Sequence, residues 1–168
     1  TPIHSSAASD VYKRQPLNAP HTPLEVNDEL VKPYLDKGLD ETTAKVYAMV
    51  QNIDENFGRL LGKLEELKLR DNTLVIFLTD NGAQQKRFNG GLRGRKASVY
   101  EGGIRVPCFA QWPGQLEGGK KVDRIAAHID LLPTIVETCA GAEFLTPADS
   151  RPRNRLDGVS LLPLLQGE

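Results

Sequence analysis

The sequence predicts an α/β fold, and a long amphipathic helix, a tight turn and a buried strand indicate it. Apolar residues recur at intervals of three and four from Val46 to Leu67, which is typical of a helix with one buried stripe. This helix is expected from about Thr42 to Leu67, with Asp40 or Thr42 as its N-cap. Thr73 to Leu78 is a continuous β-rich run, as in a strand covered on both faces. A helix, a tight turn and a buried strand in this order predict a mostly parallel central sheet flanked by helices.

The rest of the chain is predicted to hold shorter elements and a long loop. A loop with no apolar periodicity is expected from Asp80 to Ser98, and loops of this length in compact domains are usually functional. Glu101-Gly102-Gly103 is expected to form a turn that requires positive φ. The other predicted elements are an irregular segment at Pro16–Pro33, strands at Gly103–Gln111 and Val122–Ala127, and a helix capped by Asp130 that runs through Cys139.

Composition and charge exclude several classes of protein. The chain has 168 residues, which is enough for one core, and its net charge is −1, so there is no overall attraction to nucleic acid or to acidic membranes. No apolar run approaches the roughly 20 residues that a membrane-spanning helix needs. Cys108 and Cys139 are expected to pack as small apolar residues, although a disulfide between them is an open alternative.

The first fifteen residues are expected to be foreign to the protein. Asp10 to Gln15, with the sequence DVYKRQ, resembles the translation of a transposase adapter used in preparing sequencing libraries. Residues 1–15 are therefore left out of the fold prediction, and the protein's own sequence is expected to begin upstream of residue 16. The alternative is a flexible natural N-terminus.

Asp80, Asn81 and Gly82 follow the predicted strand directly and allow two interpretations. Asn-Gly is a strong hairpin signal, but a hairpin requires a second strand at once, and the residues after Gly82 do not form an apolar alternation. In open α/β sheets, ligands bind beyond the carboxyl ends of strands, and carboxylate and amide oxygens are suited to Ca²⁺ or Mg²⁺. The second interpretation is therefore a divalent-cation site at Asp80 and Asn81.

A run of cations without an acidic residue lies between Asn81 and Glu101. It could be a solvated basic loop, or it could attract an anion such as phosphate or sulfate, and its place after the possible metal site favours the anion. The cations are Lys86, Arg87, Arg93, Arg95 and Lys96.

Several motifs in order resemble those of the sulfatase family, within the alkaline-phosphatase-like superfamily. They are NAPHTPLEV near His21, TDNG at Thr79–Gly82, GLRGRKASVYEGGIRVP at Gly91–Pro107, HIDLLPT at His128–Thr134 and LDGVSLLPLL at Leu156–Leu165. No single motif is decisive, but their order and spacing together are specific. The resemblance implies a partial alkaline-phosphatase-like α/β sandwich, with residues 16–168 forming the downstream part of a sulfatase catalytic domain.

The resemblance also implies roles for individual residues. Asp80 and Asn81 match ligands of a divalent cation, usually Ca²⁺, and Lys96 matches a lysine that contacts the sulfate group. His21 matches a histidine on the ester side of the sulfate, where it could protonate the leaving oxygen. A surface lysine and a turn histidine are the alternatives. The substrate implied is a sulfate ester of a small molecule or glycan, and a periplasmic or secreted location is implied as well.

The family's nucleophile is a formylglycine made within a Cys/Ser-x-Pro/Ala-x-Arg motif, and that motif does not occur in the 168 residues. The chain is therefore expected to be a truncated fragment that is inactive alone. Two alternative functions are considered. One is a related phosphoesterase or phosphonate monoester hydrolase, and the other is a domain whose basic loop binds polyanions.

Overall fold

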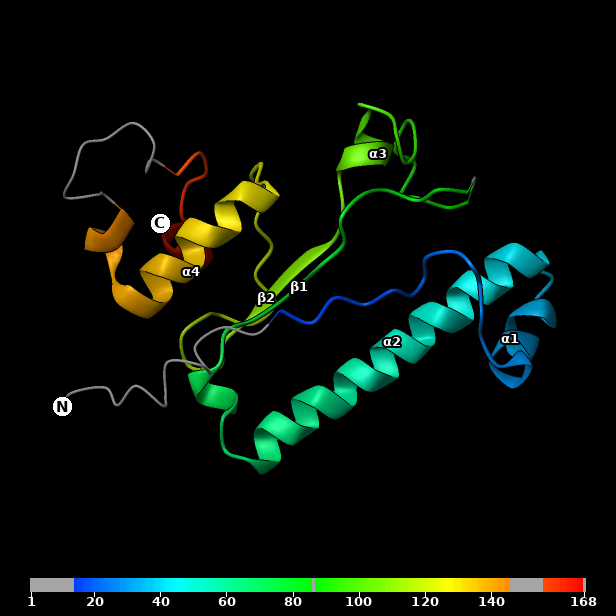
Figure 1. Ribbon diagram of the computed structural model, residues 1–168, viewed down its shortest axis with the longest axis horizontal. Helices are drawn as coiled ribbons and strands as arrows, with labels where there is room; N and C mark the ends of the chain where they lie inside the picture. The colour runs from blue at the N-terminus through cyan, green and yellow to red at the C-terminus, as the bar shows by residue number, and fades with distance from the viewer. Residues whose placement is uncertain (1–13, 86, 146–155, 168) are drawn as a thin grey trace. The chain divides into compact units, whose positions relative to one another are not determined.

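The computed structural model describes residues 14–85, 87–145 and 156–167 (Figure 1). The chain divides into two compact units. Residues 16–112 form one of them, called here the N-terminal unit, and residues 113–145 and 156–167 lie in the other, the C-terminal unit. All four predicted site residues belong to the N-terminal unit.

The small core of the N-terminal unit lies between helices α1 (Asp28–Leu35) and α2 (Glu41–Glu66). Val31 of α1 packs there against Ala44 and Ala48 of α2, and all three are almost fully buried. Helix α1 corrects the prediction that Pro16–Pro33 is wholly irregular. It forms because the Asn27 side chain accepts a hydrogen bond from the Glu29 backbone N–H, which caps the first turn.

Helix α2 confirms the long helix expected from about Thr42 to Leu67. Its predicted apolar stripe is buried at Val46 and Met49, whereas Leu60 and Leu67 are exposed. Midway along the stripe, the Phe57 ring packs edge-on against the Phe77 ring of strand β1 (Val75–Leu78), with 5.3 Å between centroids. The helix therefore contacts β1 through this ring pair, but the stripe does not cover the sheet along its whole length, because Leu60 and Leu67 are exposed.

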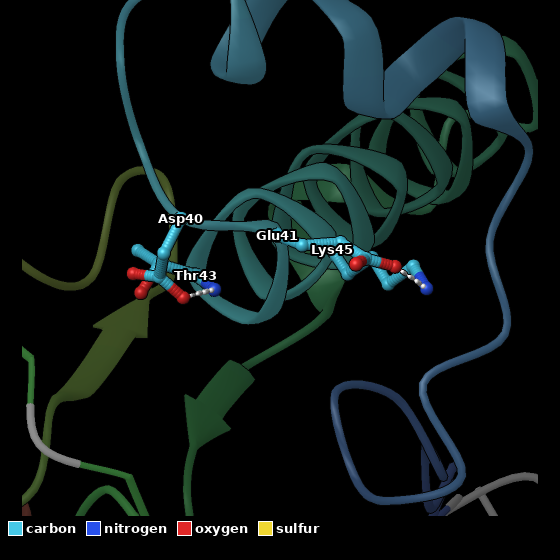
Figure 2. A network of polar contacts seen from close by, with 4 residues as sticks. All are labelled: Asp40, Glu41, Thr43 and Lys45. Atoms are coloured by element: carbon cyan, nitrogen blue, oxygen red, sulfur yellow. Dashed lines mark hydrogen bonds and ion pairs between the residues drawn. The ribbon is translucent and has the colours of Figure 1, made fainter.

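The start of α2 is held by two local polar contacts, drawn in Figure 2. Asp40 is the N-cap, and its carboxylate accepts a hydrogen bond from the Thr43 backbone N–H at 3.1 Å. Glu41 pairs with Lys45 one turn later at 2.6 Å. Hydrogen bonds from the Thr43 hydroxyl and backbone N–H hold the pKa of Asp40 below its ordinary value of 3.8. The cap is therefore strongest when Asp40 is ionised.

The stability of α2 is expected to fall in acid through Asp40. Because the folded-state pKa of this carboxyl is depressed, its contribution is present above pH 3.8 and lost as the pH falls through the lower, folded-state pKa. Asp40→Asn is the matched control, since asparagine caps a helix without titrating. Helicity at 222 nm, followed from pH 6 to about pH 2, should fall more steeply in the parent than in this variant. If helicity falls equally steeply with pH in the parent and in Asp40→Asn, the ionisation of Asp40 contributes nothing to the stability of α2.

The sheet of the described residues has two strands, β1 and β2 (Cys108–Gln111). They pair antiparallel, with Val75 opposite Gln111 and Leu78 opposite Cys108. The predicted parallel arrangement is thus not confirmed, and β1 is half-buried along its whole length. Its partner is also not the segment directly after Gly82, so the immediate hairpin does not form.

Four local predictions are wrong in whole or in part. Glu101–Ile104 forms a short helix, α3, and neither Gly102 nor Gly103 has positive φ, so the strand predicted from Gly103 is confined to β2. No strand forms at Val122–Ala127. Both cysteines are free and exposed rather than packed in a core.

The C-terminal unit is built around helix α4 (Leu131–Ala140), which confirms the helix expected from Asp130 through Cys139. It is preceded by η3 (His128–Asp130) and followed by η4 (Ala142–Leu145) and α5 (Leu162–Gln166). The buried Asp130 carboxylate accepts hydrogen bonds from the backbone N–H groups of Ala127 and Val159. Thr134 is likewise buried, and its hydroxyl accepts a hydrogen bond from the Leu161 N–H. These contacts fasten the last segment to α4.

Candidate functional site

Asp80 and Asn81 lie just beyond the end of β1. Backbone hydrogen bonds to the partner segment flank them, one from the Thr79 N–H to the Pro107 carbonyl at 3.4 Å and one from the Gly82 N–H to the Gly103 carbonyl at 2.9 Å. Asp80 is exposed, and its Oδ2 accepts a hydrogen bond from Asn81 Nδ2 at 2.6 Å. The two side chains therefore lie together and present hard oxygen atoms, Asp80 Oδ1 and Asn81 Oδ1, of the kind that Ca²⁺ and Mg²⁺ prefer.

The segment that carries Lys96 is bound to the backbone directly after this strand end. The Lys96 N–H donates to the Ala83 carbonyl at 2.9 Å, and the Gly82 N–H donates to the Gly103 carbonyl, also at 2.9 Å. These two hydrogen bonds place Lys96 beside the segment that follows Asp80 and Asn81. Three of the four predicted site residues are thus brought into one region of the N-terminal unit.

Three glycines make this close crossing of backbones possible. A Cβ atom on Gly82 would overlap the carbonyl of Gly102, and one on Gly102 would overlap the carbonyls of Arg93 and Gly94. A Cβ atom on Gly103 would overlap the carbonyls of Arg95 and Ser98. We call the contact of segments 82–83, 93–98 and 102–103 the glycine crossing. The glycines of the TDNG and EGG motifs are therefore needed for close approach, a role different from the positive φ that the sequence suggested.

Lys96 is half-buried and makes no ion pair with any carboxylate in the described part of the chain. The next residue, Ala97, has a φ of 69°, in a left-handed region that a non-glycine residue enters only at some cost. Residues with strained backbone cluster at active sites and ligand-binding sites. Among the described residues, no carboxylate competes with an anion for the Lys96 ammonium.

The other cations of the loop differ in their surroundings. Arg93 stacks on the Tyr100 ring, with its Cζ 3.8 Å from the ring centroid, and donates a hydrogen bond to the Tyr100 hydroxyl at 2.9 Å. Arg87 donates to the side chain of Gln85. Lys86 lies outside the described residues. Nothing in the sequence signalled the pairing of Arg93 with Tyr100, since the two residues are seven positions apart in a loop without periodicity.

His21 is not bonded to the other three site residues in the described structure. It is exposed, its N–H closes a turn with the Asn18 carbonyl, and its Nδ1 donates to the Thr22 carbonyl at 2.7 Å. That hydrogen bond leaves Nε2 as the ring nitrogen available to a ligand. No cluster of three or more His, Cys, Asp or Glu side chains suited to a metal occurs in residues 14–85, 87–145 and 156–167. Asp80 and Asn81 could thus supply only part of a cation's ligands.

These features define the class as an α/β protein with a polar site beyond a strand end, beside a glycine-rich loop whose Lys96 has no ion-pair partner in the described part of the chain. The family model described as Sulfatase matches residues 16–142. The chain belongs to the sulfatase family.

Curated relatives and solved structures agree with this assignment. N-acetylgalactosamine-6-sulfatase of Sus scrofa is 34% identical over 189 residues, covering 99% of this chain and 33% of the relative. Steryl-sulfatase of Homo sapiens is 35% identical over 130 residues, covering 71% of this chain and 21% of the relative. The chain thus spans about a fifth to a third of the length of these relatives.

Among solved structures, the crystal structure of Ps i-CgsB in complex with k-i-k-neocarrahexaose superposes with a TM-score of 0.75 at 30% identity. The match covers 94% of this chain and 35% of that one. The putative sulfatase yidJ from Bacteroides fragilis is 23% identical and matches with a TM-score of 0.70. The match covers 96% of this chain and 39% of that one. The second match supports the fold alone. Among the described residues, no helix combines the length and apolar character needed to cross a membrane.

Proposed function

We propose that this chain forms the downstream part of the catalytic domain of a sulfatase that hydrolyses sulfate esters with the help of a divalent cation. The completed fold is proposed to be an alkaline-phosphatase-like sandwich with a mostly parallel sheet. The observation that carries the functional proposal is the hydrogen bond from the Lys96 N–H to the Ala83 carbonyl. Through this bond the backbone of Lys96, whose side chain has no ion-pair partner among the described residues, lies beside the segment that follows Asp80 and Asn81.

Each residue has a role that suits its chemistry. Asp80 and Asn81 would hold Ca²⁺, or another divalent cation such as Mg²⁺, and the cation when bound would stabilise negative charge on the sulfate oxygens. Lys96 binds a nonbridging sulfate oxygen through its ammonium group, which stabilises the charge that builds up as the S–O bond breaks. His21, when both ring nitrogens carry a proton, uses its Nε2–H to contact the ester oxygen and to protonate the leaving group, and the ring keeps the Nδ1 proton that it donates to Thr22.

The nucleophile of the proposed reaction lies outside the 168 residues. A formylglycine requires a Cys/Ser-x-Pro/Ala-x-Arg motif, and neither Cys108 nor Cys139 stands in one. The chain alone is consequently expected to give no turnover, because it has no group to form the covalent intermediate. Two side-chain oxygens are also far fewer than the 6–8 oxygens that Ca²⁺ prefers.

The substrate class is a sulfate ester of a small molecule or of a glycan. Support comes from relatives named for such substrates, N-acetylgalactosamine-6-sulfatase and steryl-sulfatase, and from the k-i-k-neocarrahexaose complex of Ps i-CgsB. A periplasmic or secreted location is part of the proposal. The second candidate is a phosphoesterase or phosphonate monoester hydrolase, since the same cations would bind a phosphoryl group.

The test is turnover by the protein expressed from the complete gene that encodes this chain. A chromogenic aryl sulfate should be hydrolysed, and dialysis against a chelator should remove at least about 90% of the activity, with recovery on adding Ca²⁺ or Mg²⁺. Asp80→Ala should reproduce the loss in the presence of the metal, whereas Asp123→Ala, an exposed carboxylate of the C-terminal unit, should not.

Matched aryl phosphate and phosphonate esters decide between the two candidates. Faster hydrolysis of either ester than of the sulfate would replace the sulfatase proposal with the second candidate. Turnover that survives complete removal of the metal would contradict the role given to Asp80 and Asn81. Binding of sulfated polymers that weakens steeply with salt, without any turnover, would favour the polyanion-binding domain.

A further inference from the structure

The loop that carries Lys96 has almost no apolar anchor. Val99 is 86% exposed, and Gly94 lies in the left-handed region with a φ of 86°. Within the loop, two hydrogen bonds join Arg95 and Ser98, one from the Arg95 N–H to Ser98 Oγ at 3.1 Å and one from the Ser98 N–H to the Arg95 carbonyl at 3.0 Å. Segments with so little buried apolar surface open easily unless polar contacts close them.

The pair of Arg93 and Tyr100 closes this loop from the outside. Its two members stand on either side of Lys96, and their side chains meet through both ring stacking at 3.8 Å and a hydrogen bond at 2.9 Å. A backbone hydrogen bond closes the loop next to this pair, since the Gly102 N–H donates to the Arg93 carbonyl at 2.7 Å. Only a planar guanidinium can stack on the ring and donate to its hydroxyl together, so lysine would not replace Arg93.

We propose that Arg93 and Tyr100 form a clasp that positions Lys96 for the sulfate group, so that both act on catalysis through Lys96 without touching substrate. This inference rests on the proposed function. A catalytic cation that is displaced by about 1 Å loses much of its effect on the transition state, so loosening the loop lowers turnover without removing any charge from Lys96. Arg93 is thus a positioning residue and does not supply a second anion contact.

The kinetic test uses the protein expressed from the complete gene and a chromogenic aryl sulfate. Arg93→Ala and Arg93→Lys should each lower kcat by about tenfold with little change in KM, since the ground-state contacts of the substrate remain. Tyr100→Phe should lower kcat less, because the ring stays. The control is Arg59→Ala, an exposed arginine of α2 that donates to Asn56, and it should leave kcat unchanged.

A double-mutant cycle separates positioning from direct contact. If Arg93 acts through Lys96, then Arg93→Ala combined with Lys96→Ala should be no slower than Lys96→Ala alone, within about twofold. Additive losses would mean that Arg93 contacts the substrate itself, and the clasp would be overturned. A large rise in KM on Arg93→Lys would overturn it in the same way.

Hydrogen exchange on the same protein tests, independently of activity, whether the clasp orders the loop. Arg93→Ala should speed exchange of the backbone amides of residues 94–99, including the Lys96 amide bonded to Ala83, and should leave α2 unchanged. Unchanged exchange in residues 94–99 overturns the clasp whatever the kinetics show. If the unsubstituted protein has no sulfatase activity, the proposed function fails, and faster exchange still shows that the clasp orders the loop.

Discussion

Replacing Lys96 with alanine in the protein expressed from the complete gene is expected to lower kcat/KM for an aryl sulfate by on the order of 10²–10³. The reason is that Lys96 makes no ion pair with any described carboxylate and lies beside the strand end that carries Asp80 and Asn81. Removal of its ammonium takes away one fixed charge from the developing sulfate anion. Initial rates over a range of substrate concentrations measure the effect.

The matched control is Lys121→Ala. This lysine belongs to the C-terminal unit, 83% of its side chain is exposed, and its partner is Asp123 at 3.5 Å. It should leave kcat/KM within about twofold of the parent value, as for most surface substitutions. Equal losses in both variants would mean that general charge, rather than the position of Lys96, supports activity, and the role given to Lys96 would then be wrong.

Gly103→Ala is expected to destabilise the N-terminal unit by about 1–3 kcal/mol through overpacking. Gly103 is buried in the glycine crossing, where a Cβ atom would overlap the carbonyls of Arg95 and Ser98. Neither overlap can be relieved by a side-chain rotation, since both involve backbone atoms. Urea unfolding of the 168-residue chain, followed by the fluorescence of its single tryptophan, Trp112, measures the change.

Gly62→Ala is the control for that substitution. Gly62 lies in α2 with open space around the position of a Cβ atom, so alanine should stabilise the helix by about 0.5–1 kcal/mol. The two variants add the same methyl group and should shift the unfolding midpoint in opposite directions. A Gly103→Ala protein as stable as the parent would mean that segments 93–98 and 102–103 are not in close contact.

Much of the local structure could be predicted from the sequence. Helix α2 lies within one or two residues of its predicted bounds, because a cap at Asp40 and an apolar period act over a few residues each. The helix after Asp130 was also predicted from a local signal, the cap expected at its first turn. Helix α1 was missed because Pro33 and the prolines before it suggested an irregular segment, although Asn27 caps a short helix there.

The candidate site was predicted in part. Motif order suggested that Asp80, Asn81 and Lys96 belong to one site, and the hydrogen bond from Lys96 to Ala83 is consistent with that. The convergence of His21 with them stays a prediction, since no bond joins it to the other three in the described structure. The ligand set of a cation also stays a prediction, because two side chains do not complete it.

By itself, the sequence determined the α/β class, the long helix, the strand before Asp80 and the family, because caps, apolar periods and motif order are local features of the chain. Only the tertiary structure decided that β1 pairs antiparallel with β2, that Gly82, Gly102 and Gly103 permit a close crossing, and that Arg93 stacks on Tyr100. The physical reason is that each of these depends on backbone atoms or side chains from separate segments meeting at short range. No pattern within one segment encodes such a meeting.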